Sequence, residues 1–354
     1  MSPANAPRSV TTHDVARRAG VSQATVSLVL GGNPRARVAP ATRERVMRAA
    51  DELGYRPNML ARGLVRGRSY ALGVVVPDLS NPFFLDVVTG VQRVAAEAGY
   101  AVLPGDTRDT TPARHLEALR ARLVDGVVID GLGAATLPED SLADLKVVLV
   151  DEPSERWPGV ASDALSAGRL AAEHLLGLGH RRIAFVGPAT DVHGFRMRER
   201  GFFQALSAAG IPLPTGLLRR VPATVAGGLA AMKQLLAAGE RPTAVFCAND
   251  LIALGALKAA LAAGVAVPGG MSIVGCDDVE MARVVTPELT TVAVPARELG
   301  ARAARLLLRL LDGQEVSARP ARPLPVRLIT RGTTGKPQGT GDREQGTSRE
   351  TGSA

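Results

Sequence analysis

Apolar residues near the start of the chain recur at the spacing of two short helices. Residues 10–30 read VTTHDVARRAGVSQATVSLVL, with one apolar face before Gly20 and a second after it. Ser22 stands where the second helix begins, so we expect its hydroxyl to cap the free backbone N–H groups at that end. The stretch predicts two short helices that meet at a glycine turn. Their apolar positions are Val15, Ala16, Ala19, Val21, Val26, Val29 and Leu30.

The second helix leaves a mostly polar set of side chains to face outward. A short helix that is held by a partner helix and presents such side chains at its first turn fits the major groove of DNA. A helical hairpin without any nucleic-acid ligand has the same pattern, so the pattern alone leaves both interpretations open. The outward residues are Gln23, Ala24, Thr25, Ser27 and Leu28.

A third helix is predicted to begin at Pro40, after the loop GGNPRAR. Its apolar residues recur at helical spacing, and three arginines between them are expected to face solvent. The segment that follows, NMLARGLVRGRS, has a short apolar side of its own. About eight residues are too few to keep a helix folded alone, so we expect this segment to fold only against a partner. The apolar residues of the third helix are Val46, Met47, Ala50 and Leu53, and the arginines are Arg43, Arg45 and Arg48.

From residue 70 onward, short apolar runs alternate with longer amphipathic helices. Fully apolar strands separated by helices are typical of parallel sheets that are covered on both faces. We therefore predict two doubly wound α/β lobes, with a helix over 295–312 and a late strand over 325–330 crossing between them. The other predicted strands cover residues 71–77, 100–105, 125–130, 146–150, 181–187, 243–248 and 272–276.

These patterns predict a multidomain chain: an all-α head, a linker and a two-lobed α/β core between two tails. The tails contain few apolar residues and are expected to be disordered. The expected segments are a tail over 1–9, a helix-turn-helix head over 10–57, a hinge helix or linker over 58–69, a core over 70–332 and a second tail over 333–354. Lobe 1 is expected to combine 70–161 with 294–324, and lobe 2 to combine 162–293 with 325–332.

Polar residues follow the predicted strands at their carboxyl ends, where open α/β sheets bind ligands. Such a carboxylate-rich rim suits a hydroxylated small molecule. Asn249 and Asp250 directly precede a helix, so capping that helix is the alternative role for them. The rim comprises residues 78–84, Asp106, Asp130, Asp151, the residues from Gly187 onward, Asn249, Asp250, Asp277 and Asp278.

Composition narrows the class of protein. The chain has 354 residues, 46% of them apolar, and contains no run of about 18 apolar residues and no signal core. We therefore expect a cytoplasmic protein without a membrane partner. Cys247 and Cys276 each lie within an apolar run, which favours small core residues over a disulfide or a metal pair.

The positive charge is concentrated at one end of the chain. Residues 1–70 hold 12 arginines against 4 acidic residues, an excess that equals the whole net charge of +8. A polyanion is the partner that such a segment favours, because each neutralised phosphate releases counterions. The charge therefore favours a groove-reading head over a structural hairpin.

The sequence resembles the lactose-repressor (LacI/GalR-type) family of bacterial transcription regulators over residues 10–332. The resemblance implies a DNA-binding head, a hinge helix and a two-lobed core like that of periplasmic sugar-binding proteins. It also implies a homodimer that reads a near-palindromic operator, and pairing of two dimers into a tetramer is left open. The motifs are TTHDVARRAGVSQATVSLVL, RERVMRAADELGYRPNMLARGL, VVPDLSNPFF, GHRRIAFVGP, RERGF, RPTAVFCANDLIALGAL and SIVGCDD followed by TPELTTV.

Family roles carry over to the matching positions as implications of the resemblance. Base-reading positions are Gln23, Ala24 and Leu28, and phosphate-holding positions are Ser22, Thr25 and Ser27. Thr12, Asn58 and Ala61 complete the DNA-contacting set with Leu64, which matches the hinge leucine that wedges into the minor groove. Arg198 and Asp277 match the pair that clamps an effector, with Phe84, Asp151 and Asn249 as lesser contributors.

Several positions depart from the family pattern. Leu28 stands where arginine or histidine is common, so a thymine methyl replaces guanine as the expected contact. Gly63 replaces a polar hinge residue, and Ala39 replaces a serine cap before Pro40; both changes weaken local helix formation. The effector wall near Ala223 lacks an aromatic residue, so stacking is expected from Phe84 or Trp157.

The resulting expectation is a repressor whose sugar or sugar-derivative effector changes the angle between the lobes. A purine or another polar metabolite acting as corepressor is the alternative effector. A transport binding protein is disfavoured by the basic head and the missing signal peptide. An enzyme is disfavoured because the chain has no P-loop, no G-x-S-x-G, no H-E-x-x-H and no histidines at metal spacing. No cofactor or metal is expected.

Overall fold

The computed structural model describes residues 10–30, 38–55, 68–108, 111–121, 124–132, 142, 145–212, 215–239, 241–318 and 322–337. The chain forms two compact units, residues 1–70 and residues 71–354, which are described separately. The predicted tail over 1–9, residues 338–354 and most of the predicted hinge lie outside the described residues. The predicted DNA contacts Asn58, Ala61 and Leu64 therefore lie outside them too.

The head is a bundle of three helices, as predicted. These are α1 (Thr12–Ala19), α2 (Gln23–Leu30) and α3 (Pro40–Glu52). Val15, Val26 and Val46 contribute one fully buried side chain from each helix to a single small core. Thr11 caps α1 in a reciprocal pair with Asp14, whereas Ala39 offers α3 no side-chain cap.

One predicted core residue of the head is wrong. Met47 is 47% exposed, and Ala49 is buried in its place. Val46, Ala49, Ala50 and Leu53 follow the i, i+3, i+4, i+7 spacing of one helix face, from which Met47 is rotated by about 100°. The spacing of residues along the helix therefore predicts the buried positions of α3 better than the hydrophobicity of Met47 does.

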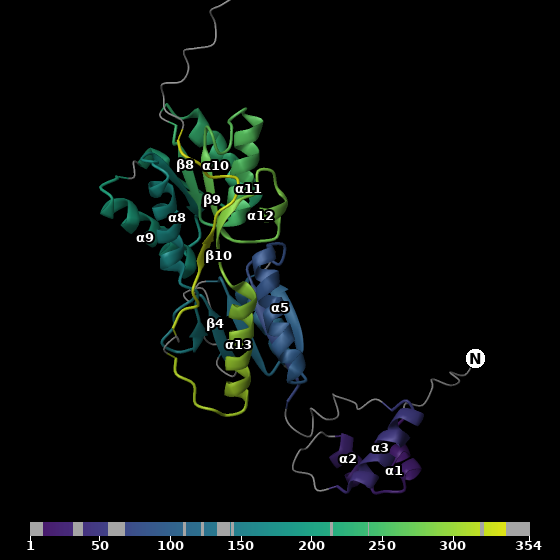
Figure 1. The fold of residues 1–354 in the computed structure, drawn as a ribbon. Helices are drawn as coiled ribbons and strands as arrows, with labels where there is room; N and C mark the ends of the chain where they lie inside the picture. Colours follow the sequence, from purple (N-terminus) through teal and green to yellow (C-terminus); the bar gives the residue numbers. More distant parts are fainter. Residues whose placement is uncertain are drawn as a thin grey trace, which may run out of the picture. The chain divides into compact units, whose positions relative to one another are not determined.

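Lobe 1 of the core is a five-stranded parallel sheet with the order β2-β1-β3-β4-β5. Helices α5 and α13 pack against each other on one face of this sheet (Figure 1). The apolar side of α6 packs on the other face with buried strand residues. The elements are β1 (Ala71–Val76), α5 (Pro82–Glu97), β2 (Ala101–Asp106), α6 (Pro112–Ala121), β3 (Gly126–Asp130), β4 (Lys146–Val150), β5 (Gly159–Val160) and α13 (Ala296–Leu311).

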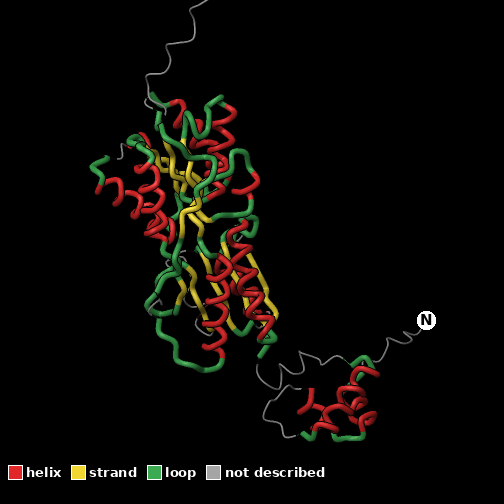
Figure 2. The backbone as a smooth tube through the Cα atoms, viewed as in Figure 1, coloured by secondary structure: helices red, strands yellow, loops and turns green. Residues whose placement is uncertain are grey.

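Lobe 2 is a six-stranded sheet with the order β11-β10-β9-β8-β6-β7, parallel except for β11. The pairs α8–α9 and α10–α11 flank it (Figures 1 and 2). The elements are α8 (Ala164–Gly177), β6 (Ile183–Pro188), α9 (His193–Ala208), η2 (Thr215–Leu217), β7 (Leu218–Val221), α10 (Val225–Ala237), β8 (Ala244–Cys247), α11 (Asp250–Ala262), β9 (Ser272–Asp277), α12 (Met281–Val284), β10 (Thr290–Ala293) and β11 (Arg327–Ile329). The predicted fold class, a helical head and a two-lobed core with parallel sheets, is confirmed.

Three helix pairs of the core cross at closely apposed glycines. On α8, a Cβ added at Gly168 would lie 1.7 Å from the carbonyl oxygen of Arg198 on α9, and one at Gly201 would lie 1.9 Å from that of Leu165. The same reciprocal arrangement joins α10 to α11 and α5 to α13. Each pair approaches so closely because neither backbone carries a side chain at the crossing.

The end of lobe 2 corrects one predicted boundary. Thr333 is fully buried, its hydroxyl donates to the carbonyl of Ile273, and the carbonyl of Gly335 accepts from Ser272 and His180. Residues 333–337 are therefore ordered, although a low apolar content predicted disorder from residue 333. Within the described ranges, no helix is long and apolar enough to span a bilayer.

Candidate functional site

The start of α2 forms a hydrogen-bonded patch with α1. The hydroxyl of Ser22 accepts from the backbone N–H of Thr25 at 3.2 Å, which confirms the predicted cap, and lies 2.9 Å from the hydroxyl of Thr25. The side-chain amide of Gln23 donates to the hydroxyl of Thr12 at 2.8 Å. Four predicted DNA-contacting residues are thus linked on one exposed face of the head.

The other three predicted contacts on α2 are also accessible. Ala24 and Ser27 are exposed, and the side chain of Leu28 is 44% exposed. Among the described residues of the head, only Leu28 and Met47 are large apolar side chains with this much exposure. An isolated apolar side chain beside polar ones is able to contact a thymine methyl in the major groove.

A pocket of about 230 Å³ lies between the two lobes of the core. Its volume is below the range of about 300–1,000 Å³ that is usual for drug-sized ligands, so it fits a small molecule. The carboxyl ends of β3, β4 and β9 contribute a carboxylate each, as expected for a ligand site in open α/β sheets. Lobe 1 supplies Phe84, Asp130 and Asp151, and lobe 2 supplies Phe195, Arg198 and Asp277.

Arg198 and Asp277 form a buried ion pair on the lobe 2 side of the pocket. Their Nη2 and Oδ1 atoms are 2.9 Å apart, and both side chains are about 95% buried. Arg198 also donates from Nη1 to the carbonyl of Ala248 at 2.6 Å. Burial raises the pKa of Asp277 to about 7, against the opposing effect of the guanidinium. Asp277 has a φ of 124°, a strained conformation of the kind that occurs at ligand sites.

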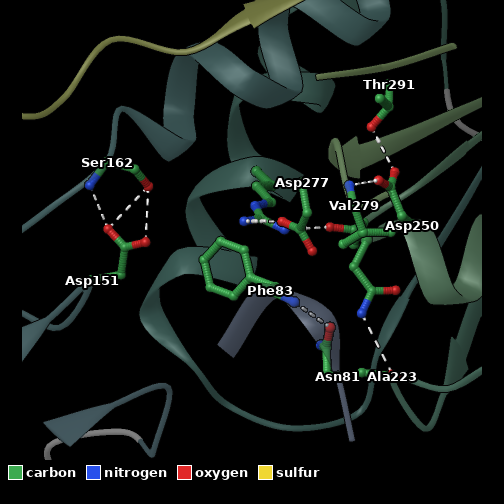
Figure 3. A network of polar contacts seen from close by, with 12 residues as sticks. Asn81, Phe83, Asp151, Ser162, Ala223, Asp250, Asp277, Val279 and Thr291 are labelled. Carbon is green, nitrogen blue, oxygen red and sulfur yellow. Dashed lines mark hydrogen bonds and ion pairs between the residues drawn. The ribbon is translucent and has the colours of Figure 1, made fainter. Parts of the chain in front are cut away.

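Asp151 lies on the lobe 1 side, directly after β4. Its carboxylate accepts from the backbone N–H of Ser162 at 2.5 Å and from the Ser162 hydroxyl at 2.9 and 3.0 Å (Figure 3). Burial raises the pKa of Asp151, and the hydrogen bonds from Ser162 oppose that shift. The residue has a φ of 52°, so the backbone turns sharply where β4 ends.

Asp130 is the third carboxylate and follows β3 in the same sheet. It is 2% exposed, and its Oδ2 atom has no hydrogen-bond partner among the described residues. Burial raises its pKa well above the usual value, with further contributions from the negative charges of Asp151 and Asp277. Sequence reasoning included Asp130 in the polar rim but did not select it as a site residue.

Asn249 does not line the pocket. Its side-chain oxygen accepts from the backbone N–H of Ile252 at 2.9 Å, which caps α11, and its amide donates to the carbonyl of Ala223 at 3.5 Å. Asp250 is likewise engaged, with the N–H of Val279 at 2.9 Å and the hydroxyl of Thr291 at 2.6 Å. Asn249 thus supports the wall of the pocket at Ala223, and its effector contact stays a prediction.

The aromatic residues of the pocket differ in part from the expected ones. Phe84 lines it as predicted, together with Phe83 and Phe195. Trp157 packs on the apolar cluster of lobe 1 instead, and the guanidinium of Arg156 lies over its ring. Phe195 precedes Arg198 by three residues, so one turn of α9 presents both to the pocket. This spacing on a helix could have identified Phe195 as a pocket residue from the sequence.

Comparisons with known proteins agree with this architecture. The family model "Bacterial regulatory proteins, lacI family" matches residues 11–58, and "Periplasmic binding protein-like domain" matches residues 172–334. The HTH-type transcriptional repressor CytR of Escherichia coli (strain K12) is 36% identical over 333 residues, which are 92% of this chain and 96% of that protein.

Two solved structures share the fold over most of the chain. The Lac repressor dimer bound to operator and the anti-inducer ONPF matches with a TM-score of 0.80 at 32% identity, covering 93% of this chain and 100% of that one. The transcriptional regulator CelR in complex with cellobiose matches with a TM-score of 0.70 at 33% identity, covering 92% and 99%.

Proposed function

The chain belongs to the lacI family of bacterial regulatory proteins, and from this membership we propose that a small, hydroxyl-rich, sugar-like effector binds between its lobes. The protein is a DNA-binding transcription regulator rather than an enzyme. Its closeness to repressors makes repression of an operator the function that we assign to it.

The buried pair of Arg198 and Asp277 is the observation that carries the effector proposal. A guanidinium and a carboxylate side by side offer donors and acceptors to neighbouring hydroxyl groups of one ring. Asp151 offers further acceptor positions across the pocket, and Phe84 and Phe195 offer apolar faces. The solved complex of CelR with cellobiose supports a sugar as the class of ligand.

The position of these groups also supports a mechanism of control. Asp130 and Asp151 belong to lobe 1, whereas Arg198 and Asp277 belong to lobe 2. A ligand that contacts both sets stabilises one angle between the lobes over others. Such a difference in affinity is what a ligand requires to shift a conformational equilibrium.

In the head, we assign base contacts to Gln23, Ala24 and Leu28. Phosphate contacts are assigned to Ser22, Thr25 and Ser27, with Thr12 holding Gln23 in place. Asn58, Ala61 and Leu64 are assigned to the hinge contact with DNA on the basis of family resemblance. Exposure of the α2 residues and the hydrogen bond between Gln23 and Thr12 support the assignments in the head.

A homodimer fits the surface of the core. Leu85 is 47%, Met281 36% and Val284 71% exposed, although each is a large apolar side chain. Phe83 and Asp86 on α5 line one hollow with Asp278 and Val279, which places the start of α5 beside the segment that leads into α12. Exposed apolar groups on neighbouring elements are typical of a protein interface.

The effector assignment is tested with two arginine variants of one helix. A preferred duplex is first selected from a randomised pool, and candidate sugars are then titrated while fluorescence anisotropy reports release or tightening. Arg198→Ala should lose the response, whereas Arg196→Ala should keep it, because Arg196 pairs with Asp191 on the surface of α9.

Asp277→Asn, which keeps the side-chain shape, guards against a folding defect in the first variant. Unchanged sugar affinity in both Arg198→Ala and Asp277→Asn would place the effector elsewhere. Loss of response in Arg196→Ala as well would show that α9 is sensitive to any change, rather than that its pocket face binds.

A further inference from the structure

We propose that the effector of this protein carries a protonated amino group, as an amino sugar does, and that Asp130 receives it. This inference rests on the proposed function of the pocket between the lobes and specifies the ligand that the pocket selects. Two buried carboxylate oxygens of the pocket lack a hydrogen bond among the described residues, Oδ2 of Asp130 and Oδ1 of Asp277. Oδ1 of Asp277 lies 2.9 Å from the guanidinium of Arg198, whereas Oδ2 of Asp130 has no ion-pair partner there either.

Each of the other carboxylates of the pocket already has partners. Asp277 pairs with Arg198 at 2.9 Å, and Asp151 accepts three hydrogen bonds from Ser162. Asp78 lies 3.0 Å from a guanidinium nitrogen of Arg108, and it also accepts from the backbone N–H and hydroxyl of Ser80 at 2.7 and 2.6 Å. Each of these carboxylates therefore has a donor or a cation within the protein itself.

Asp130 differs from them in its lack of a partner for one oxygen. It is 98% buried at the end of β3, it lines the pocket, and its Oδ2 atom has no hydrogen-bond partner within the described part of the chain. Leaving a buried carboxylate unpaired is costly, and such groups in folded proteins are normally matched by a donor or a cation. The missing donor is therefore supplied from inside the pocket.

The charges around Asp130 favour a cationic donor over a neutral one. Asp78, Asp130, Asp151 and Asp277 line the pocket with Arg198 as the one guanidinium among its described lining residues. Burial, and repulsion from the negative charges of Asp151 and Asp277, raise the pKa of Asp130. A neutral hydroxyl on the ligand does not offset this repulsion. An ammonium group supplies both donors and the opposite charge, whereas a phosphate or carboxylate on the ligand would add repulsion.

The test compares matched sugars that differ only at one nitrogen. Glucosamine, galactosamine and mannosamine are titrated into the full-length protein by calorimetry at pH 6.5, beside the parent hexoses and the N-acetylated forms. In the wild type, an amino sugar should bind about tenfold more tightly than its parent and its acetylated form, the ratio expected when a charge-assisted hydrogen bond replaces a neutral one.

Two variants assign that preference to Asp130. Asp130→Asn keeps the size of the side chain and removes its charge, so the preference should fall to about twofold or less, while the melting temperature of the free protein should rise as a buried unpaired carboxyl is removed. Glu173→Gln is the matched control: it removes an exposed carboxylate of α8 that pairs with Arg169 outside the pocket, and the preference should remain.

The outcomes separate this inference from the proposed function. Tight binding of the parent hexoses without any gain from the amine overturns the role of Asp130 and leaves a sugar effector standing. A preference for the amine that persists in Asp130→Asn overturns the role of Asp130 as well. Absence of binding by every sugar of the panel contradicts both the amino-sugar inference and the sugar-like effector.

Discussion

Replacing Gly168 by alanine should separate α8 from α9 and thereby displace the arginine of the effector pocket. The new Cβ would lie 1.7 Å from the carbonyl oxygen of Arg198 and 2.7 Å from the backbone nitrogen of Phe202. Both atoms belong to the backbone of α9, so no side chain is able to rotate out of the way. The helices must therefore move apart by more than about 1 Å before the contact becomes tolerable.

The expected cost is that of overpacking a close interface. Such insertions typically cost about 1–3 kcal/mol and sometimes more, from which the better helix propensity of alanine recovers up to about 1 kcal/mol. We expect a net loss of about 2 kcal/mol, which lowers the melting temperature by about 4–8 °C in a domain of this size. The carbonyl oxygen that the new Cβ would overlap belongs to Arg198 itself. Its displacement should also lower effector affinity by about tenfold or more.

The control is Gly177→Ala at the other end of the same helix. A Cβ at Gly177 has nothing within 4 Å, so this substitution should leave effector affinity unchanged. The melting temperature should stay the same or rise slightly. Thermal denaturation and effector-dependent operator release are measured for both variants. A Gly168→Ala protein as stable as Gly177→Ala, with wild-type effector affinity, would refute the close crossing as the determinant of Arg198 placement.

Four further predictions concern the head, the hinge, the subunit contact and the buried histidine. Leu28→Arg should change the preferred base at one symmetric pair of operator positions, and an unchanged preference in a randomised-operator selection would remove Leu28 from the readout. Gly63→Ser should tighten operator binding at matched salt without altering effector affinity, since serine disfavours a helix less than glycine does; equal operator affinities would contradict this. Val284→Asp should convert a dimer to monomers in analytical ultracentrifugation, and a dimer that persists places the interface elsewhere. Burial lowers the pKa of His180, so the unfolded chain binds its proton first and His180 costs stability as pH falls below about 6.5; denaturant titrations between pH 7 and 5 should show a smaller loss for His180→Gln than for wild type, and identical losses would exclude His180 as the cause.

Local pattern predicted the three helices of the head and most of the buried strands, because the spacing of apolar residues reflects which positions are buried. Val15, Val26 and Val46 are fully buried as their positions in the pattern indicate. Strand β7 was not predicted because LRRV is short and half of its residues are charged. Such a sequence is tolerated at the edge of a sheet, where Arg220 pairs with Glu199. Strand β10 was not predicted either, because TTVA contains two polar threonines. Both threonines are buried in the folded protein, where their hydroxyls form hydrogen bonds.

The site was predictable to the extent that it follows from strand ends. Asp151 and Asp277 end predicted strands, and both line the pocket together with Arg198. Whether a polar residue at such an end binds a ligand or caps a helix depends on which way its side chain turns, and this is set by tertiary contacts. Asn249 caps a helix as a result, and Asp130 lines the pocket with its Oδ2 atom unpartnered among the described residues.

The hydrogen bond between Gln23 and Thr12 bears on how the head would distinguish one base pair from another. The amide of Gln23 gives one hydrogen to Thr12, which leaves one N–H and the carbonyl oxygen for other partners. One donor beside one acceptor complements the N7 and N6 edge of adenine. Immobilising a long side chain on binding costs about 0.5–1.5 kcal/mol of conformational entropy. Much of this cost is absent for a side chain that is already hydrogen-bonded in the free protein. The head therefore meets the duplex with its discriminating group held in a restricted conformation, so that a mismatched base finds little freedom there to adapt.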